Sequence, residues 1–242
     1  MRARPRDGRP FLVPVAAVAT VGVAWLAVAA REHDSLSRFD PVAARDVLRL
    51  RTPTLTDLAQ ALTFVGGEVV VGALAVIVLT FLLVRRQVAR AATFAVGVGG
   101  SAFLTVAVKL LVERARPGST YRLGTFDASY SFPSGHTLNS AVFLMLVVWL
   151  LWPTAVAAQR GALVVGATLL AVGVGASRVY LGYHWLTDVL ASGLIAVAWG
   201  AVVLLLRERI ERVVSASRLV LSRRPGTAAA GPPPPDRAAH RL

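Results

Sequence analysis

Long apolar runs separated by short polar connections are the dominant pattern along this chain. Six runs approach or exceed the roughly 20 residues that an α-helix needs to cross a bilayer. They lie at about 11–30, 66–84, 91–112, 137–152, 161–177 and 189–206. The fourth and fifth runs are short and need help from Trp149, Trp152 or flanking polar residues. The pattern predicts an all-α fold, a polytopic membrane bundle of six transmembrane helices.

The longest connection, residues 31–65, has an amphipathic pattern of its own, with leucines and valines interspersed among charges. This pattern is typical of a helix that lies on a membrane surface. Thr52-Pro53 predicts a break in any helix there, because proline disfavours helical backbone in the residue before it. For Glu68, just beyond the connection, a position at the water boundary is favoured over a proton-carrying or ligand-binding role.

Composition supports the membrane class. Of the 242 residues, 55% are hydrophobic, and the mean hydropathy is +0.62. The chain has no cysteine, which excludes disulfides and thiolate chemistry. Lys109 is the only lysine, and every other basic side chain is arginine.

The net charge of +13 is concentrated on one side of the predicted membrane. The N-terminal segment, the 85–90 connection, Arg160 and the tail after Leu206 are all basic and fall together if the spans alternate. This positive-inside pattern predicts cytoplasmic termini and disfavours a nucleic-acid partner. Segment 31–57 is the weak point, because its five arginines, balanced by five acids, are assigned outside.

The ends of the chain have separate interpretations. Residues 1–10 are basic and precede an apolar run of about 20 residues, longer than the 7–15 of a signal peptide, so a retained helix is favoured over a cleaved signal. The sequence predicts three parts of the chain: a cytoplasmic N-terminus (1–10), a membrane domain (11–206) and a cytoplasmic tail (207–242). Within the tail, 207–224 is basic and suited to anionic lipid, whereas the proline-rich 225–242 predicts disorder.

Three short polar blocks at the ends of apolar runs carry the candidate chemistry. The first contains Lys109 and, seven residues later, Arg116-Pro117. If the third helix continues to Arg116, both cations project from one face, because seven residues are close to two turns. An ammonium and a planar guanidinium make different contacts to one phosphate. The alternative is a local ion pair between Lys109 and Glu113.

The second block, Pro133-Ser134-Gly135-His136, opens the fourth span. Gly135 allows close approach of the backbone, and the first amides of a helix form an anion site. Ser134 has the side chain of a helix N-cap. His136, in the first turn of this predicted helix, has a side chain that can donate a proton to a leaving oxygen. Alone, the block is only a plausible helix start.

The third block is Ser177-Arg178, His184 and Asp188. The last two are one helical turn apart, so the carboxylate can hold one ring nitrogen and leave the other as a nucleophile. Arg178 can neutralise a phosphate under attack. A zinc site is the alternative for His184, but the cations nearby would repel a metal, so an anion is favoured.

Topology supports the convergence of these blocks. With six spans, the third and fifth connections emerge on the same membrane face, and all three blocks fall there. The predicted site therefore faces away from the cytoplasm.

The pattern resembles the type 2 phosphatidic acid phosphatase family (PAP2, or lipid phosphate phosphatases), which shares its core with vanadium haloperoxidases. Residues 109–117, 133–136 and 177–188 match the three family motifs in order and spacing. The motifs cover residues 109–188, and the six-helix plan extends the likeness to about 11–206. The resemblance implies a hydrolase that needs no metal and no organic cofactor.

The resemblance also implies roles for individual residues. His184 would attack phosphorus and form a phosphohistidine, with Asp188 orienting its ring. His136 would protonate the departing group and then activate water. The phosphoryl oxygens would be held by a further set: Lys109, Arg116, Ser134, the Gly135 amide and Arg178. Ser177 could contact phosphate or only support the helix end.

The sequence thus predicts a bacterial, multi-pass membrane phosphatase whose partners are membrane lipid and a lipid phosphate substrate. Phosphatidic acid, phosphatidylglycerol phosphate, lysolipid phosphates and polyprenyl diphosphates such as undecaprenyl diphosphate all fit the pattern. The alternatives are a haloperoxidase, which six apolar spans disfavour, and a non-catalytic binder or transporter of phosphorylated lipid. Oligomeric state leaves no trace in the sequence.

Overall fold

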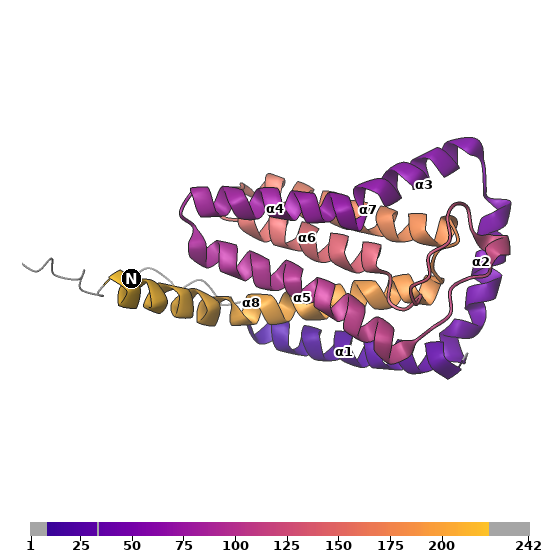
Figure 1. The fold of residues 1–242 in the computed structure, drawn as a ribbon, viewed down its shortest axis with the longest axis horizontal. Coiled ribbons are helices and arrows are strands. Elements are labelled where there is room, and N and C mark those ends of the chain that lie inside the picture. The colour runs from indigo at the N-terminus through magenta and orange to yellow at the C-terminus, as the bar shows by residue number, and fades with distance from the viewer. Residues whose placement is uncertain (1–8, 33, 223–242) are drawn as a thin grey trace, which may run out of the picture.

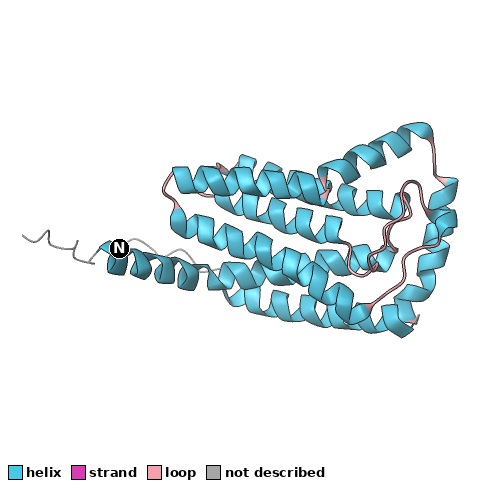
Figure 2. Cartoon of the chain, viewed as in Figure 1, coloured by secondary structure: helices cyan, strands magenta, loops and turns pink. Residues whose placement is uncertain are grey.

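The computed structural model describes residues 9–32 and 34–222, and every regular element in these ranges is a helix (Figures 1 and 2). The eight α-helices are α1 (Arg9–Glu32), α2 (Asp40–Arg49), α3 (Pro53–Val65), α4 (Glu68–Val84), α5 (Val88–Val112), α6 (Gly135–Leu151), α7 (Ala157–Tyr180) and α8 (Leu186–Ser222). Two short 3-10 helices, η1 (Ser35–Phe39) and η2 (Ser119–Tyr121), lie in the connections. The all-α prediction is confirmed.

The long helices form one bundle in which α8 is central. α1 and α5 pack along α8, and α6 packs against α5, α7 and α8. The start of α1 and the far end of α8 lie toward one end of the bundle (Figure 1). The connections after α5 and α7 lie at the other end, together with α2. The bundle therefore gathers the loops that hold the three polar blocks at a single end.

Helices occur at all six predicted spans, but the number of spans is confirmed only in part. Four of the described helices, α1, α5, α7 and α8, are long and apolar enough to cross a membrane. The pair α3 and α4 makes a fifth if the two helices, bent by 42° at their junction, act as one span. α6 is apolar but has only 17 residues. Six spans therefore stay a prediction.

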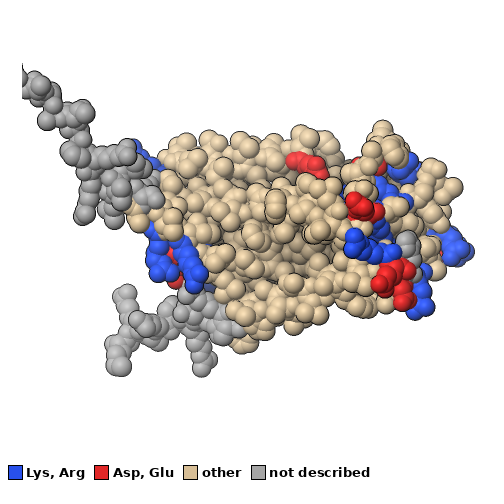
Figure 3. All heavy atoms as spheres, turned by 60° about the horizontal axis from the view of Figure 1, so that its bottom comes forward, with Lys and Arg blue, Asp and Glu red and all other residues tan. Residues whose placement is uncertain are grey.

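The surface supports a membrane setting. Charged side chains gather at the two ends of the bundle, and the broad middle of the face in Figure 3 is almost free of them. Many large apolar side chains are also exposed along the long helices, among them Phe11, Val76, Phe103 and Leu169. An uncharged band between two charged rims matches a hydrocarbon layer between two aqueous surfaces. The chain is a multi-pass membrane protein.

The predicted extension of the third helix to Arg116 is wrong. α5 ends at Val112, because Glu113 adopts a left-handed backbone with φ of 53°. The next residues have no regular secondary structure before η2. Pro117 therefore does not end the helix, and Arg116 and Lys109 do not share a helical face.

The 31–65 connection folds as η1, α2 and α3, with the predicted break at Thr52-Pro53. The Thr52 side chain accepts from the amide of Leu55 and caps α3, whose first residue is Pro53. Proline is well suited to this position because its missing N–H would have no partner there. α3 packs against α7 rather than lying apart on a surface. The connection therefore belongs to the wall of the bundle.

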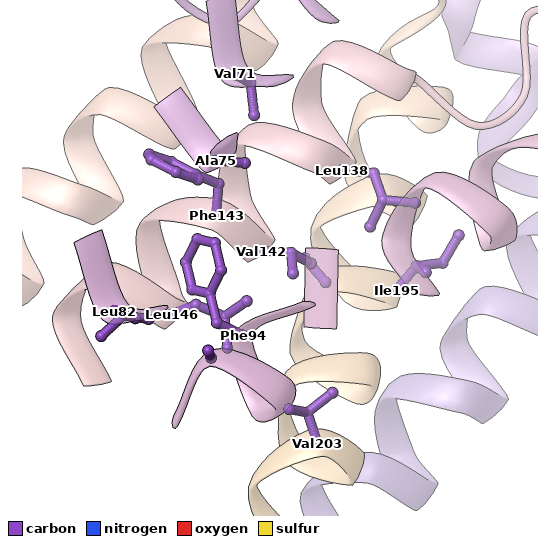
Figure 4. Close-up of a cluster of buried hydrophobic side chains, with 12 residues drawn as sticks. Val71, Ala75, Leu82, Phe94, Leu138, Val142, Phe143, Leu146, Ile195 and Val203 are labelled. Carbon is purple, nitrogen blue, oxygen red and sulfur yellow. The ribbon is translucent and has the colours of Figure 1, made fainter. Parts of the chain in front are cut away.

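The core joins α4, α5, α6 and α8 (Figure 4). Phe94 and Phe143 meet edge to face, with ring centroids 6.1 Å apart. The Trp199 indole donates from Nε1 to the carbonyl of Gly97 at 2.8 Å, and a Cβ at Gly100 would collide with the same ring. These contacts fix α5 against α8, the two helices that precede and follow the candidate site.

The predicted boundary at residue 206 is not a helix end. α8 continues through it to Ser222. The predictions for residues 1–8 of the N-terminal segment and for the proline-rich tail after Arg224 lie outside the described residues.

Candidate active site

Arg116 occupies the centre of the cluster formed by the first and third polar blocks. Its Nη1 lies 3.2 Å from His184 Nε2 and donates to the Tyr183 carbonyl at 2.7 Å. Its Nε and Nη2 donate to the backbone and side chain of Ser129. Nη2 also pairs with Asp127 at 2.6 Å. Arg116 thus reaches the predicted site from the irregular segment after α5 rather than from α5 itself.

Lys109, in the last turn of α5, contacts the loop before α6. Its Nζ donates to Ser129 Oγ at 3.3 Å and to the backbone carbonyl of Tyr130. The ion pairs among the described residues do not include the alternative pair with Glu113. Lys109 and Arg116 therefore converge on Ser129 from two different elements.

The second polar block forms the start of α6 as predicted. Ser134 is the N-cap and accepts from both the amide and the hydroxyl of Thr137. Its own backbone is held by Ser192 of α8, which donates to the Ser134 carbonyl and accepts from its amide. Gly135 faces Glu68, whose Oε1 would lie 3.0 Å from a Cβ at that position. The helix start is thus held by several contacts, and a side chain at Gly135 would press against Glu68.

His136 follows in the first turn of α6. Its Nε2 lies beside Gly67, where it would be 3.8 Å from an added Cβ. The groups that act on it electrostatically include Arg178 and His184, the other members of the predicted site. His136 therefore lies close enough to Arg178 and His184 to feel their charges.

Arg178 is buried at the end of α7. Its Nη1 donates to Thr63 Oγ1 at 2.8 Å, and its guanidinium lies over the Tyr183 ring, 4.1 Å from the centroid. Among the described residues its buried Nε has no hydrogen-bond partner. Such a group is costly unless a partner binds it. Ser177, by contrast, donates back to Val174 within α7, which is a helix-end contact.

His184 and Asp188 form the predicted pair. His184 lies in the turn before α8, and its Nδ1 is 3.4 Å from Asp188 Oδ2. The same oxygen accepts from Ser131 Oγ at 2.5 Å and from the Trp185 amide at 2.9 Å. Because the guanidinium of Arg116 can only donate, Nε2 offers its lone pair and the ring proton belongs on Nδ1.

Burial lowers the pKa of His184 to about 4, and the nearby charges of Arg116 and Arg178 act in the same direction. The hydrogen bond and charge of Asp188 oppose this shift. At neutral pH the ring is therefore neutral, and Nε2 carries a lone pair that faces Arg116. The backbone and charge contacts of Asp127 lower its pKa against the effect of its burial, so it is ionised beside Arg116.

The sequence did not reveal several residues of this region. Asp40 and Arg114 are buried charged residues joined to Asp188. Ser131 and Asp127 belong to the loop before α6 and contact His184, Asp188 and Arg116. Arg114 lies inside the first polar block, so a basic residue two positions before Arg116 was a visible signal. Asp40 left none, because it is distant in sequence.

The donor set suits an anion rather than a metal. Within the described ranges no group of three or more histidine, cysteine, aspartate or glutamate side chains is arranged to hold a metal ion. Arg116 and Arg178 instead act electrostatically on both His184 and His136, and Lys109 shares Ser129 with Arg116. The class is therefore a helical membrane protein with cations and a buried histidine–carboxylate pair at one end of its bundle.

The sequence model of the PAP2 superfamily matches residues 90–212, and the chain belongs to this superfamily. It is 28% identical over 169 residues to phosphatidylglycerophosphatase B of Bacillus subtilis (strain 168), covering 69% of this chain and 82% of that protein. It is 40% identical over 85 residues to phosphatidylglycerophosphatase B of Escherichia coli (strain K12), a local match to 35% of this chain and 32% of that protein. The chain is a hydrolase that acts on lipid phosphates.

Solved structures show the same fold. A transmembrane PAP2 type phosphatidylglycerolphosphate phosphatase from Bacillus subtilis superposes with a TM-score of 0.72 at 26% identity, covering 81% of this chain and 98% of that chain. LpxE of Aquifex aeolicus gives a TM-score of 0.53 at 22% identity, covering 69% of this chain and 94% of that chain. The second likeness concerns the fold alone.

Proposed function

We propose that this membrane hydrolase removes phosphate from a lipid phosphate monoester or diphosphate through a phosphohistidine on His184. The observation that carries the proposal is the environment of His184 Nε2. The lone pair faces the cations, 3.2 Å from Arg116 Nη1, while Asp188 holds the opposite nitrogen. A neutral imidazole held in this way is a nucleophile aimed at an anion site.

The reaction proceeds in two displacements. Nε2 of His184 attacks phosphorus, and the bond between phosphorus and the lipid oxygen breaks as His136 gives that oxygen a proton. His136 then takes a proton from water, the water oxygen bonds to phosphorus, and the bond to Nε2 breaks. Inorganic phosphate leaves and both histidines return to their starting states. The charge on the phosphoryl oxygens is held by Lys109, Arg116, Arg178 and the Gly135 amide.

The buried Nε of Arg178, which has no partner within residues 9–32 and 34–222, supports this assignment, because a phosphoryl oxygen would supply an acceptor. Ser134 has a smaller part in the proposal than the sequence suggested. Its hydroxyl oxygen already accepts two hydrogen bonds from Thr137, so only its own proton is left for a phosphoryl oxygen. We place Ser177 outside the site, because its hydroxyl donates its proton to the Val174 carbonyl.

An apolar groove beside the site supports a lipid substrate. It has a volume of about 630 Å³ and lies between α2 and α3 on one side and α7 and α8 on the other. Thr137 and Ser177, the neighbours of His136 and Arg178 in sequence, are among its lining residues. We place the hydrocarbon tail of the substrate in this groove, where the tail stays out of water and within the bilayer.

Phosphatidylglycerol phosphate is the first substrate to test, because the proteins of similar sequence and structure are named for it. Phosphatidic acid and polyprenyl diphosphates follow. The distribution of basic residues supports six spans with both termini in the cytoplasm and the site on the opposite side. No metal or organic cofactor enters the proposed steps.

The test is phosphate release by the purified full chain in nanodiscs across this lipid panel, with and without EDTA. We expect release from at least one lipid, unchanged by EDTA, and its loss in His184→Ala that remains folded. Binding or movement of lipid without phosphate release would point instead to a non-catalytic binder or transporter. Full activity in His184→Ala would reject the proposed nucleophile.

A further inference from the structure

A buried chain of charges extends from the His184–Asp188 pair toward the outer connection. Arg114 donates from Nη1 to Asp188 Oδ1 at 2.6 Å and from Nη2 to Asp40 Oδ2 at 2.7 Å. Asp40, Arg114 and Asp188 are only 2%, 6% and 0% exposed. One guanidinium therefore joins two carboxylates that come from helices α2 and α8.

Thr187 closes this cluster. Its hydroxyl donates to Asp40 Oδ2 at 2.5 Å and accepts from Arg114 Nη1 at 2.7 Å, and its amide donates to Asp40 Oδ1 at 3.0 Å. The Arg114 guanidinium also lies over the Trp185 ring, 5.6 Å from its centroid. Each oxygen of Asp40 thus has a donor. A buried carboxylate so completely bonded is held in one orientation.

The two carboxylate oxygens of Asp188 have different partners in the cluster. Oδ1 accepts from Arg114, whereas Oδ2 faces His184 Nδ1 and accepts from Ser131 and the Trp185 amide. Arg114 therefore fixes the rotation of the carboxylate that orients the histidine. It is a positioning residue, since it meets the reacting nitrogen only through Asp188.

Asp40 has a different part in the cluster, which follows from its charge. If Arg114 and Asp188 were alone, their opposite charges would cancel beside His184. Asp40 adds a second negative charge, so the three residues together carry a single net negative charge. This matters because the ring of His184 becomes positive once Nε2 bonds to phosphorus, while Arg116 and Arg178 oppose a positive charge there.

We propose that Asp40 is a positioning residue that neutralises Arg114 and thereby leaves the charge of Asp188 free to stabilise phosphorylated His184. The proposal rests on the proposed function, because it concerns the step in which His184 is phosphorylated. It joins the connection between α1 and α3, which lies outside the three polar blocks, to the chemistry of the site.

The test is a charge-compensation cycle measured on the full chain in nanodiscs. Dioctanoyl phosphatidic acid is the substrate, and kcat, KM and the apparent melting temperature are followed for each variant. Asp40→Asn brings the net charge of the cluster to zero, and the double variant Asp40→Asn/Arg114→Gln returns it to one negative charge. Asp46→Asn is the matched control, because Asp46 is exposed on the same helix and pairs with Arg49.

We expect Asp40→Asn to lower kcat about 10- to 100-fold, as removal of a buried partner of a site residue commonly does, with little change in KM. The double variant should recover to within about tenfold of the wild-type kcat, and the rates should follow the charge of the cluster rather than the melting temperature. Asp46→Asn should match the wild type.

A kcat of Asp40→Asn within twofold of the wild type would overturn the inference, as would a folded double variant no faster than Asp40→Asn. If Asp40→Asn alone does not fold, the double variant tests the inference by itself. A kcat within tenfold of the wild type would support the inference, and a lower kcat would overturn it. Failure of the proposed function looks different, because then the wild type releases no phosphate or His184→Ala stays active.

Discussion

Arg116 Nη1 lies 3.2 Å from His184 Nε2, and this contact fixes the chemical state of the histidine. A guanidinium has only N–H donors, so the histidine nitrogen that faces it must be the acceptor. The lone pair of His184 is therefore held among cations, on the side where an anionic phosphoryl group would bind. Arg116 has five donors in a rigid fork, and this contact uses one of them.

Replacing Arg116 with lysine should show that the reaction needs the forked guanidinium and not only a positive charge at this position. An ammonium on a flexible stem cannot contact Ser129, Tyr183 and His184 together, as Arg116 does. We expect kcat for phosphate release to fall about 10²- to 10³-fold, the loss typical of removing one preorganised donor to a transition state. Steady-state kinetics with dioctanoyl phosphatidic acid measures the effect.

The matched control for this change is Arg122→Lys. Arg122 belongs to the same loop but lies over the Phe126 ring, 5.2 Å from its centroid. We expect its kcat to stay close to that of the wild type. Equal activities in the two lysine variants would mean that any cation serves at position 116.

The low pKa of His184 predicts an acid-sensitive fold. Burial lowers this pKa to about 4, whereas an unfolded histidine titrates near 6.5. Between these values the unfolded chain binds a proton that the native chain does not, so the free energy of unfolding decreases as the pH falls from about 6.5 to about 4. Above pH 6.5 the ring is neutral in both states and contributes no pH dependence.

The apparent melting temperature of the wild type and of His184→Gln, from pH 8 to pH 4, measures this contribution. We expect the wild type to lose more stability than the variant between pH 6.5 and pH 4, and the two curves to run parallel above pH 7. Curves that stay parallel throughout would show that His184 titrates normally in the native protein.

Filling the apolar groove should affect long-chain substrates selectively. Gly193 lines the groove and has open space where a Cβ would stand, so Gly193→Phe adds a ring without an initial clash. Displacing two methylenes of a lipid tail costs about 1.6 kcal/mol, which raises KM about tenfold. We expect this increase for a dioleoyl substrate and little change for p-nitrophenyl phosphate, which has no tail.

Gly72→Phe provides the control, because Gly72 also has open space around it but does not line the groove. Its KM for both substrates should match that of the wild type. An equal rise in KM for the two substrates in Gly193→Phe would indicate a general distortion of the site rather than a blocked tail.

The sequence predicted the helical class and suggested the candidate site residues, because both depend on local patterns. Apolar runs locate helices, and Ser134 caps α6 as its side chain suggests. The path of the chain between Lys109 and Arg116 was not predictable in this way. Glu113 ends α5 in a left-handed conformation, which glycine or asparagine would have signalled but glutamate does not.

The charge network behind Asp188 depends on contacts between distant segments. Asp40 and Asp188 are joined through Arg114, across 74 positions on either side. Asp40 looked like one of several acids in a mixed-charge connection. Only packing of α2 against α8 brings it to Arg114, and a single sequence contains no record of that packing.

The central claim is that His184 becomes phosphorylated, and trapping that intermediate tests it most directly. The variant His136→Ala lacks the group that activates water, and p-nitrophenyl [³²P]phosphate has a phenolate that leaves without a proton from His136. After rapid quenching, we predict a covalent label on the peptide that contains His184, stable in alkali, lost in acid and absent from His136→Ala/His184→Ala. Release of nitrophenolate without any labelled protein, or a label that survives in the double variant, would contradict the account.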